Sequence, residues 1–207
     1  MFDFDGLLID TETTALRAWR DEFEARGVVL PPELWHAVAG TRASRSTLLA
    51  YLRQETGPFD GEVVLKSWLA RQHAAAAAED LRDGVRAYLD AAAARGIRLA
   101  VASSATGDWV CGHLARVGVL DRFDVISCGD DHPPKPQPDV YLATVAALGV
   151  PAREAAAFED SPPGVAAAKA AGLYCVAVPN PATAALCFDQ ADRVMTSFAV
   201  PVWDFAD

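Results

Sequence analysis

Asp3 and Asp5 stand two residues apart at the end of a short apolar segment, and Gly6 follows them. In an extended chain, side chains two apart point to the same side, so both carboxylates can face one site while Phe4 packs on the other side. Carboxylate oxygens bind hard divalent cations. The pair is therefore a candidate metal-binding or catalytic pair, although a solvated strand end is the more ordinary explanation of such a pair when it stands alone.

Three further apolar segments end in residues with chemistry of their own. The segments are IRLAVA (97–102), FDVISC (123–128) and AAAFE (155–159). The first runs into Ser103 and Ser104, whose hydroxyls and neighbouring backbone N–H groups suit an oxyanion such as phosphate. The second precedes a proline-stiffened loop that carries Lys135, and the third ends in Glu159, followed by Asp160. Taken singly, these residues also have structural explanations: a helix N-cap, a solvated lysine, and a capping acid beside a surface acid.

The combination is more specific than its parts. The carboxyl ends of parallel strands form one crevice, which would gather four carboxylates. They belong to Asp3, Asp5, Glu159 and Asp160. Like charges disfavour such a cluster unless cations compensate them. Lys135 and a divalent ion would supply this compensation, and oxygen-only ligands beside a substrate phosphate favour Mg²⁺.

The segments that position these residues are of two kinds. From about Arg82 onward, short apolar runs alternate with Ala-rich amphipathic stretches, which predicts an α/β fold with a parallel sheet and helices on both faces. Residues from about 13 to 79 instead show helical periodicity, punctuated by proline and glycine. We therefore expect a core formed by residues 1–12 and 81–207, with an α-helical cap inserted at residues 13–80.

Composition narrows the possible partners. The chain of 207 residues carries 18 Lys and Arg against 28 Asp and Glu, without a basic stripe, so we expect no nucleic-acid partner. No apolar run approaches the length of a spanning helix, and the N-terminal residues lack the pattern of a secretory signal, so we expect no membrane partner. The four cysteines, without a CxxC pair, are interpreted as reduced core residues. These features predict a cytoplasmic protein, which we expect to be a monomer or weak dimer.

The first strand is short for a central one. A strand usually has about five residues, yet only Met1 and Phe2 precede Asp3. Such a strand would lose ladder hydrogen bonds and leave Asp3 near a frayed end. We therefore expect the natural protein to begin upstream of Met1.

Four stretches, in the order DFDGLLIDTE, VASSA, PKPQPD and FEDSPPG, resemble the four motifs of the haloacid-dehalogenase superfamily. The resemblance spans nearly the whole chain, including the helical insert. It implies a Rossmann-like core and the helical cap of the subfamily that contains β-phosphoglucomutase and many small-metabolite phosphatases. The implied reaction is Mg²⁺-dependent hydrolysis of a small-molecule phosphate ester such as a sugar phosphate.

The resemblance also implies a role for each motif residue. Asp3 would be the nucleophile that forms an aspartyl-phosphate, and Asp5 would be the general acid and base. Ser103, Ser104 and Lys135 would bind the transferring phosphoryl group. The Mg²⁺ ligands would be Asp3, the main-chain carbonyl of Asp5, and one or both of Glu159 and Asp160.

Residue types separate the branches of this superfamily. Dehalogenases generally lack an acid at the place of Asp5, because a halide leaves without a proton. Phosphonate-cleaving members replace that acid and use a cap lysine, for which Lys66 is the only candidate in the cap. In β-phosphoglucomutase a histidine helps to set the general acid and base, and the matching position is Ala15. The pattern favours a phosphatase, with a phosphosugar mutase as the alternative.

Four residues of the cap are candidates for substrate contacts. They are Gly40, Thr41, Arg42 and Arg45. In that role they would select an acidic or polyhydroxylated leaving group, whereas a solvated polar helix face is the structural alternative. A second alternative for the whole protein is a member of the fold that binds a phosphorylated ligand without catalysis.

Overall fold

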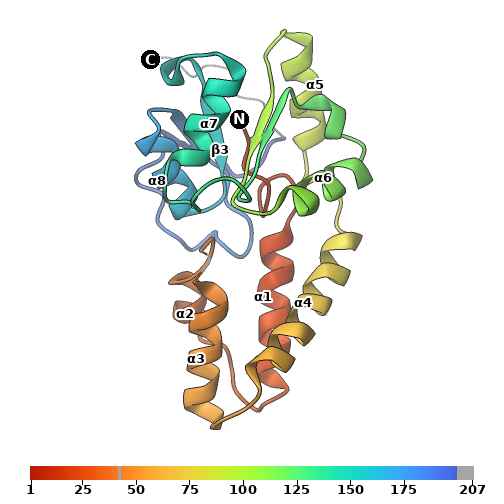
Figure 1. Cartoon of the computed structure of the whole chain (residues 1–207), viewed down its shortest axis with the longest axis vertical. Helices are drawn as coiled ribbons and strands as arrows, with labels where there is room; N and C mark the ends of the chain where they lie inside the picture. The colour runs from red at the N-terminus through yellow and green to blue at the C-terminus, as the bar shows by residue number, and fades with distance from the viewer. Residues whose placement is uncertain (42, 200–207) are drawn as a thin grey trace.

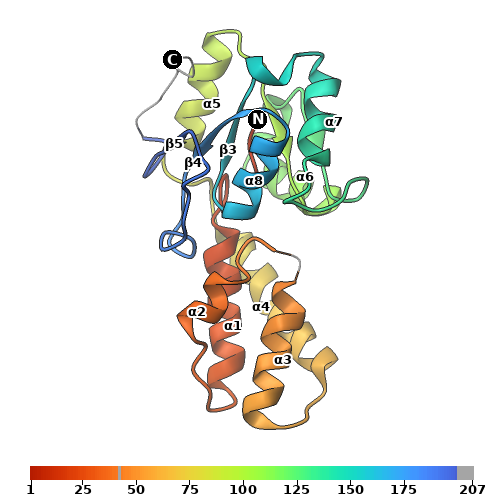
Figure 2. The ribbon, with the colours of Figure 1, turned by 90° about the vertical axis from the view of Figure 1, so that its left-hand side faces the viewer.

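The computed structural model describes residues 1–41 and 43–199. The chain forms two lobes, one with a sheet flanked by helices and one of helices alone, as Figures 1 and 2 show from two directions. Among the described residues, no helix combines the length and the apolar character that crossing a bilayer requires.

The sheet lies in the first lobe, and its paired strands run parallel to one another. The strands are β1 (Ala100–Ala102), β2 (Val125–Ser127), β3 (Ala156–Glu159), β4 (Tyr174–Ala177) and β5 (Arg193–Val194). β1 pairs with β2, and β4 lies between β3 and β5. The carboxyl ends of these strands therefore lie along the same edge of the sheet.

Residues 1–3 join the two groups of strands. Phe2 forms parallel bridges to both β1 and β3. Its N–H donates to the Ala100 carbonyl at 2.8 Å, and the Asp3 N–H donates to the Phe158 carbonyl at 3.0 Å. The order across the sheet is thus β2, β1, residues 1–3, β3, β4, β5, which confirms the predicted parallel α/β fold. Although residues 1–3 form a short segment, they hydrogen-bond to both neighbouring strands. That the natural protein begins upstream of Met1 stays a prediction.

Different helices cover the two faces of the sheet. α5 (Val85–Ala94) and α6 (Gly107–Arg116) share one buried cluster, and α7 (Asp139–Leu148) and α8 (Pro162–Ala170) share another. Val101 of β1 packs in the first cluster, whereas its neighbours Ala100 and Ala102 pack in the second. This alternation is the period of two that a strand imposes on its side chains. Two short 3₁₀ helices, η1 (Leu120–Arg122) and η2 (Ala152–Glu154), complete this lobe.

The second lobe contains four helices in the described residues. They are α1 (Thr11–Glu24), α2 (Pro32–His36), α3 (Ser44–Thr56) and α4 (Gly61–Ala78). Trp19 of α1 stacks on Trp68 of α4, with ring centroids 5.1 Å apart, in a buried cluster that also contains Trp35 and Phe23. The aromatic residues of this lobe therefore form its core. The division of the chain into core and cap at residues 12 and 80 stays a proposal.

Side-chain to main-chain hydrogen bonds fix the chain at the junction of the two lobes. The Arg82 guanidinium donates to three carbonyls of the first lobe, those of Gly6, Val178 and Pro179, at 2.7, 3.0 and 2.7 Å. The Trp35 indole N–H donates to the Ala182 carbonyl at 2.9 Å. The Arg82 bonds fix the segment that follows the helical lobe, and the Trp35 bond joins α2 to the segment after β4.

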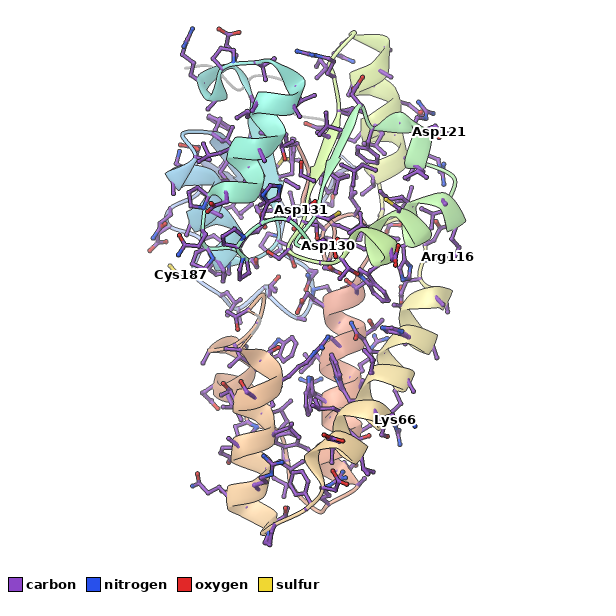
Figure 3. The ribbon with its side chains drawn as sticks, in the orientation of Figure 1. Lys66, Arg116, Asp121, Asp130, Asp131 and Cys187 are labelled. Carbon is purple, nitrogen blue, oxygen red and sulfur yellow. The ribbon has the colours of Figure 1, made fainter. Side chains whose placement is uncertain are left out.

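The cysteines differ from the sequence prediction in their burial. All four are free, as predicted, but only Cys175, in strand β4, is buried. Cys187 is exposed (Figure 3), so its assignment to the core was wrong. The error has a physical reason, because Cys187 lies in the irregular segment after Asn180 rather than in a strand or helix.

Phe2 offers a test of the central segment. Its ring stacks on Phe158 with centroids 4.9 Å apart and is fully enclosed, so Phe2→Ala should lower the free energy of unfolding by about 3–5 kcal/mol. Urea denaturation followed by circular dichroism would measure the change. Leu142→Ala on α7 is the control, because this side chain is 46% exposed and its loss should cost about 0.5 kcal/mol or less. Equal losses for the two variants would contradict a central role of residues 1–3.

Candidate active site

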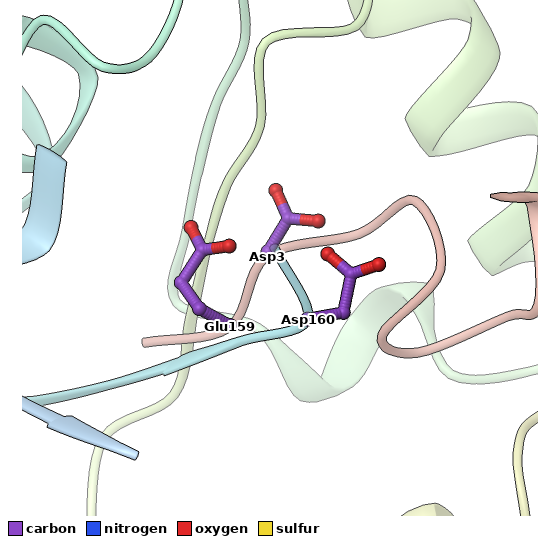
Figure 4. Close-up of side chains that lie close together, drawn as sticks. All are labelled: Asp3, Glu159 and Asp160. Atoms are coloured by element: carbon purple, nitrogen blue, oxygen red, sulfur yellow. The ribbon is translucent and has the colours of Figure 1, made fainter. Parts of the chain in front are cut away.

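Three buried carboxylates meet at the carboxyl edge of the sheet. Asp3 ends the central segment, Glu159 ends β3 beside it, and Asp160 follows directly (Figure 4). One oxygen from each of the three lies within 4.8 Å of the others. Adjacent parallel strands therefore bring together residues that are more than 150 positions apart in sequence.

Lys135 reaches this cluster from the loop after β2. Its Nζ lies 2.5 Å from Asp3 Oδ1 and 2.6 Å from Glu159 Oε1, and it donates to the Ala102 carbonyl at 2.8 Å. Burial alone would lower the pKa of Lys135, but the charges of Asp3 and Glu159 outweigh it and raise the pKa above its usual value. The lysine is therefore a fixed, permanently charged cation rather than a solvated one.

The cluster still holds more negative charge than Lys135 compensates. Burial, followed by the charge of Asp3, raises the pKa of Asp160 well above its ordinary value. Burial also raises the pKa of Glu159 to about 7, although Lys135 opposes this shift. Glu159 Oε2 is buried with no hydrogen-bond partner among the described residues. An unpaired buried oxygen beside two other carboxylates is a donor set that fits a divalent cation bound by oxygen.

Close packing holds Glu159 and Asp160 in place. A Cβ on Gly164 would lie 1.8 Å from Glu159 Oε2, so only glycine leaves room for this carboxylate. The hydroxyl of Tyr141 donates to Glu159 Oε1. The Asn180 side-chain amide donates to Asp160 Oδ2 at 2.7 Å and to the Gly6 carbonyl at 3.1 Å. No motif in the sequence points to Tyr141 or Asn180, which come from segments outside the four motifs.

Asp5 has a separate environment beside the cluster. The Thr11 hydroxyl donates to Asp5 Oδ1 at 2.7 Å, and the Trp109 indole N–H donates to the same oxygen at 2.9 Å. Burial, and then the charge of Asp3, raises the pKa of Asp5 to about 6. A carboxyl group that changes protonation near neutral pH can both give and take a proton.

Ser103 and Ser104 lie between the end of β1 and the start of α6. Ser103 is fully buried, and its hydroxyl oxygen accepts the Ala105 N–H at 3.1 Å. The hydroxyl oxygen of Ser104 accepts the Lys135 N–H at 3.1 Å. The N-cap of α6 is Thr106, so neither serine is the helix cap that the structural alternative required.

One cavity of about 800 Å³ connects the predicted residues of the two lobes. From the sheet lobe it is lined by Asp3, Asp5, Ser103, Ser104, Lys135 and Asp160, and from the helical lobe by Gly40, Thr41 and Arg45. Glu159 lies behind Lys135 and does not line the cavity. Arg42 lies outside the described residues. Lys66 is exposed on α4, away from the sheet (Figure 3), and it is not among the lining residues.

The predicted cap residues differ in what they touch. Gly40 has φ +72°, and a Cβ there would lie 2.7 Å from Ser161 Cβ, so this glycine permits close approach of the two lobes. The Thr41 hydroxyl donates to the Val38 carbonyl at 2.7 Å. The Arg45 guanidinium lies over the Trp68 ring, 4.8 Å from its centroid. Arg45 is therefore held at the cavity wall by a cation–π contact.

Glu12 and His73 also line the cavity, and the sequence motifs do not assign either of them a role. Burial, and then the charges of Asp5 and Asp3, raises the pKa of Glu12 to about 8. His73 of α4 packs against Trp109, with ring centroids 4.8 Å apart. The helical lobe thus reaches the surroundings of Asp5 as well as the cavity.

Comparison with known proteins agrees with the geometry. Residues 1–178 match the family model described as haloacid dehalogenase-like hydrolase. The chain is 41% identical over 201 residues to the "Putative phosphatase YhcW" of Bacillus subtilis strain 168, which covers 96% of this chain and 91% of the relative.

Two solved structures extend the comparison. The structure of CbbY from Rhodobacter sphaeroides in complex with xylulose-(1,5)bisphosphate matches with a TM-score of 0.71 and 31% identity, covering 96% of this chain and 93% of that one. A Thermotoga maritima structure described as a "putative beta-phosphoglucomutase" matches with a TM-score of 0.75 and 27% identity, covering 94% and 92% of the two chains. Since the family model covers most of the sequence, the chain belongs to the haloacid dehalogenase-like hydrolases.

Proposed function

We propose that this protein is a Mg²⁺-dependent phosphohydrolase that cleaves a small phosphorylated metabolite, a sugar phosphate, through an aspartyl-phosphate. The observation that carries the proposal is the contact of Lys135 with Asp3 at the floor of a cavity, with Asp5 held beside them by its own hydrogen bonds. The phosphatase name of the Bacillus relative supports the same reaction class.

The first step transfers the phosphoryl group to the protein. An oxygen of the Asp3 carboxylate forms a bond to phosphorus while the bond from phosphorus to the leaving oxygen breaks. The electron pair of that bond goes to the leaving oxygen, which takes the proton of Asp5 and departs as an alcohol. The positive charge of Lys135 offsets the repulsion between the phosphate and the attacking carboxylate.

The second step returns the protein to its starting state. Asp5, now a carboxylate, takes a proton from water as the water oxygen bonds to phosphorus. The bond between phosphorus and Asp3 breaks, which frees the Asp3 carboxylate and inorganic phosphate. Because covalent transfer divides one difficult reaction into two, neither step needs an unassisted attack of water on the ester. Ser103 and Ser104, which line the cavity beside Lys135, would bind the oxygens of the phosphoryl group.

The buried acids supply a fitting place for Mg²⁺. Asp3, Glu159, Asp160 and the main-chain carbonyl of Asp5 would hold the ion, and the unpaired Glu159 Oε2 supports this assignment. When bound, Mg²⁺ supplies positive charge that stabilises the transferring phosphoryl group. Asn180 keeps Asp160 Oδ2 occupied by a hydrogen bond, which orients that carboxylate.

A sugar phosphate is the substrate class that the cavity and the relatives favour. The cavity has room for a small metabolite, and its wall carries the Arg45 cation and the Glu12 carboxyl, groups that can bind hydroxyl or acidic substituents. The CbbY structure holds a sugar bisphosphate. The mutase alternative rests on the β-phosphoglucomutase-like structure. Against the mutase, the methyl group of Ala15 offers no polar atom that could act on Asp5. A mutase must also protect its aspartyl-phosphate from water.

The first prediction is metal-dependent phosphate release. Across a panel of phosphorylated metabolites, wild-type protein with Mg²⁺ should release inorganic phosphate from a few sugar phosphates, and EDTA should remove at least about 99% of the rate, because several kcal/mol of charge stabilisation are lost. A malachite-green assay would measure it. A folded protein that binds sugar phosphates without releasing phosphate would indicate the non-catalytic alternative, and conversion between two sugar phosphates would indicate the mutase.

The second prediction concerns the covalent intermediate. Asp3→Asn should lower kcat by about 10³-fold or more, because the amide is not a nucleophile. Acid quenching of wild-type protein with a ³²P-labelled sugar phosphate should leave a label that hydroxylamine releases, and the variant should carry none. Asp10→Asn is the matched control, since Asp10 caps α1 outside the cavity and asparagine can also cap a helix. An unlabelled wild-type protein that still turns over would show direct hydrolysis instead.

A further inference from the structure

The two carboxylate oxygens of Asp5 differ in their hydrogen bonds. Both the Thr11 hydroxyl and the Trp109 indole N–H donate to Oδ1. No hydrogen bond from the described residues reaches Oδ2, although Asp5 lines the cavity. A carboxyl group held by one oxygen has a fixed direction for the other. Oδ2 is therefore the oxygen that can meet the leaving oxygen of a substrate.

Thr11 and Trp109 differ in where they come from. Thr11 begins α1, only six residues from Asp5, so its contact forms within one local turn. Trp109 lies in the first turn of α6, 104 residues away from Asp5 in the sequence. The indole N–H is thus the one long-range contact in this pair, and it depends on how α6 and the Asp5 turn sit relative to each other.

The indole ring is itself in contact with two histidines. His113 of α6 packs edge-on against Trp109, with centroids 4.2 Å apart, and is buried. The Arg116 guanidinium, which can only donate, lies 3.2 Å from His113 Nδ1, so this nitrogen accepts. His73 of α4 also packs on Trp109, with ring centroids 4.8 Å apart. One neighbour belongs to the sheet lobe and the other to the helical lobe.

We propose that Trp109 is a positioning residue for Asp5: it holds Oδ1 so that Oδ2 points at the leaving oxygen, and the helical lobe aids this alignment through His73. The proposal rests on the proposed function of Asp5 as the proton donor. Proton donation is sensitive to direction, since a misaligned donor loses part of the rate gain of about 10²–10⁴-fold that general acid catalysis provides. Trp109 itself exchanges no proton with the substrate.

The test compares two leaving groups in Trp109→Phe. Phenylalanine keeps an aromatic ring between the two histidines but removes the N–H. Phenyl phosphate needs a proton on its leaving oxygen, whereas p-nitrophenyl phosphate leaves readily as the anion. We expect kcat/KM for phenyl phosphate to fall about tenfold or more. For p-nitrophenyl phosphate it should fall by no more than about twofold, because that reaction gains little from a proton donor. The inhibition constant of inorganic phosphate should stay the same.

Trp68→Phe is the matched control. Trp68 also lines the cavity and also donates its indole N–H, at 3.2 Å, but to the main-chain carbonyl of Ala15. Its replacement should change kcat/KM by the same factor for both esters. His73→Ala should show the pattern of Trp109→Phe at a smaller size, since it removes one side of the support of the ring.

The outcomes separate this inference from the proposed function. Equal factors for the two esters in Trp109→Phe, with phosphate inhibition unchanged, would overturn the positioning role and leave the phosphatase intact. A loss of phosphate inhibition in that variant would show a general structural role for Trp109 and would also overturn the proposal. If wild-type protein released phosphate neither from these esters nor from any sugar phosphate, the proposed function would fail, and the inference would fall with it.

Discussion

Buried negative charge is the constraint on which the rest of the site depends. Asp3, Glu159 and Asp160 are all enclosed, and a carboxylate leaves water only when positive charge or hydrogen bonds replace the lost hydration. Lys135 supplies part of this compensation through two short contacts. The negative charge that Lys135 does not compensate favours the binding of a further cation. Binding of that cation would therefore also stabilise the edge of the sheet.

The surrounding fold meets this demand by fixing each acid through a different element. Glu159 occupies the space left by the missing side chain of Gly164, and Asp160 is held by Asn180 from the segment after β4. Asp5 forms no ion pair with Lys135, and burial, followed by the charge of Asp3, raises its pKa. Two carboxylates two residues apart in sequence thereby have different surroundings: Asp3 is paired with the Lys135 cation, whereas Asp5 has a raised pKa.

The sequence was informative wherever spacing determines position. Alternating apolar and amphipathic segments predicted the parallel sheet with helices on both faces, and the ends of those segments predicted that Asp3, Lys135 and Asp160 would meet. Spacing could not find Trp109 or Asn180, because both act through long-range hydrogen bonds that leave no periodic pattern. It also could not separate core from exposed cysteine, since burial of Cys187 depends on packing rather than on local apolar character.

The place of residues 1–3 in the sheet has a consequence for how the protein is made. Residues 1–3 leave the ribosome well before their hydrogen-bonding partners in β1 and β3, which lie about a hundred and more than a hundred and fifty residues later in the chain. The central segment of the sheet, which is apolar, therefore stays unpaired until most of the chain has left the ribosome. The helical lobe can form earlier, because its contacts are local. Such non-local closure is slow and exposes an aggregation-prone segment. Asp3 is thus synthesised long before the strands that fix its position in the sheet.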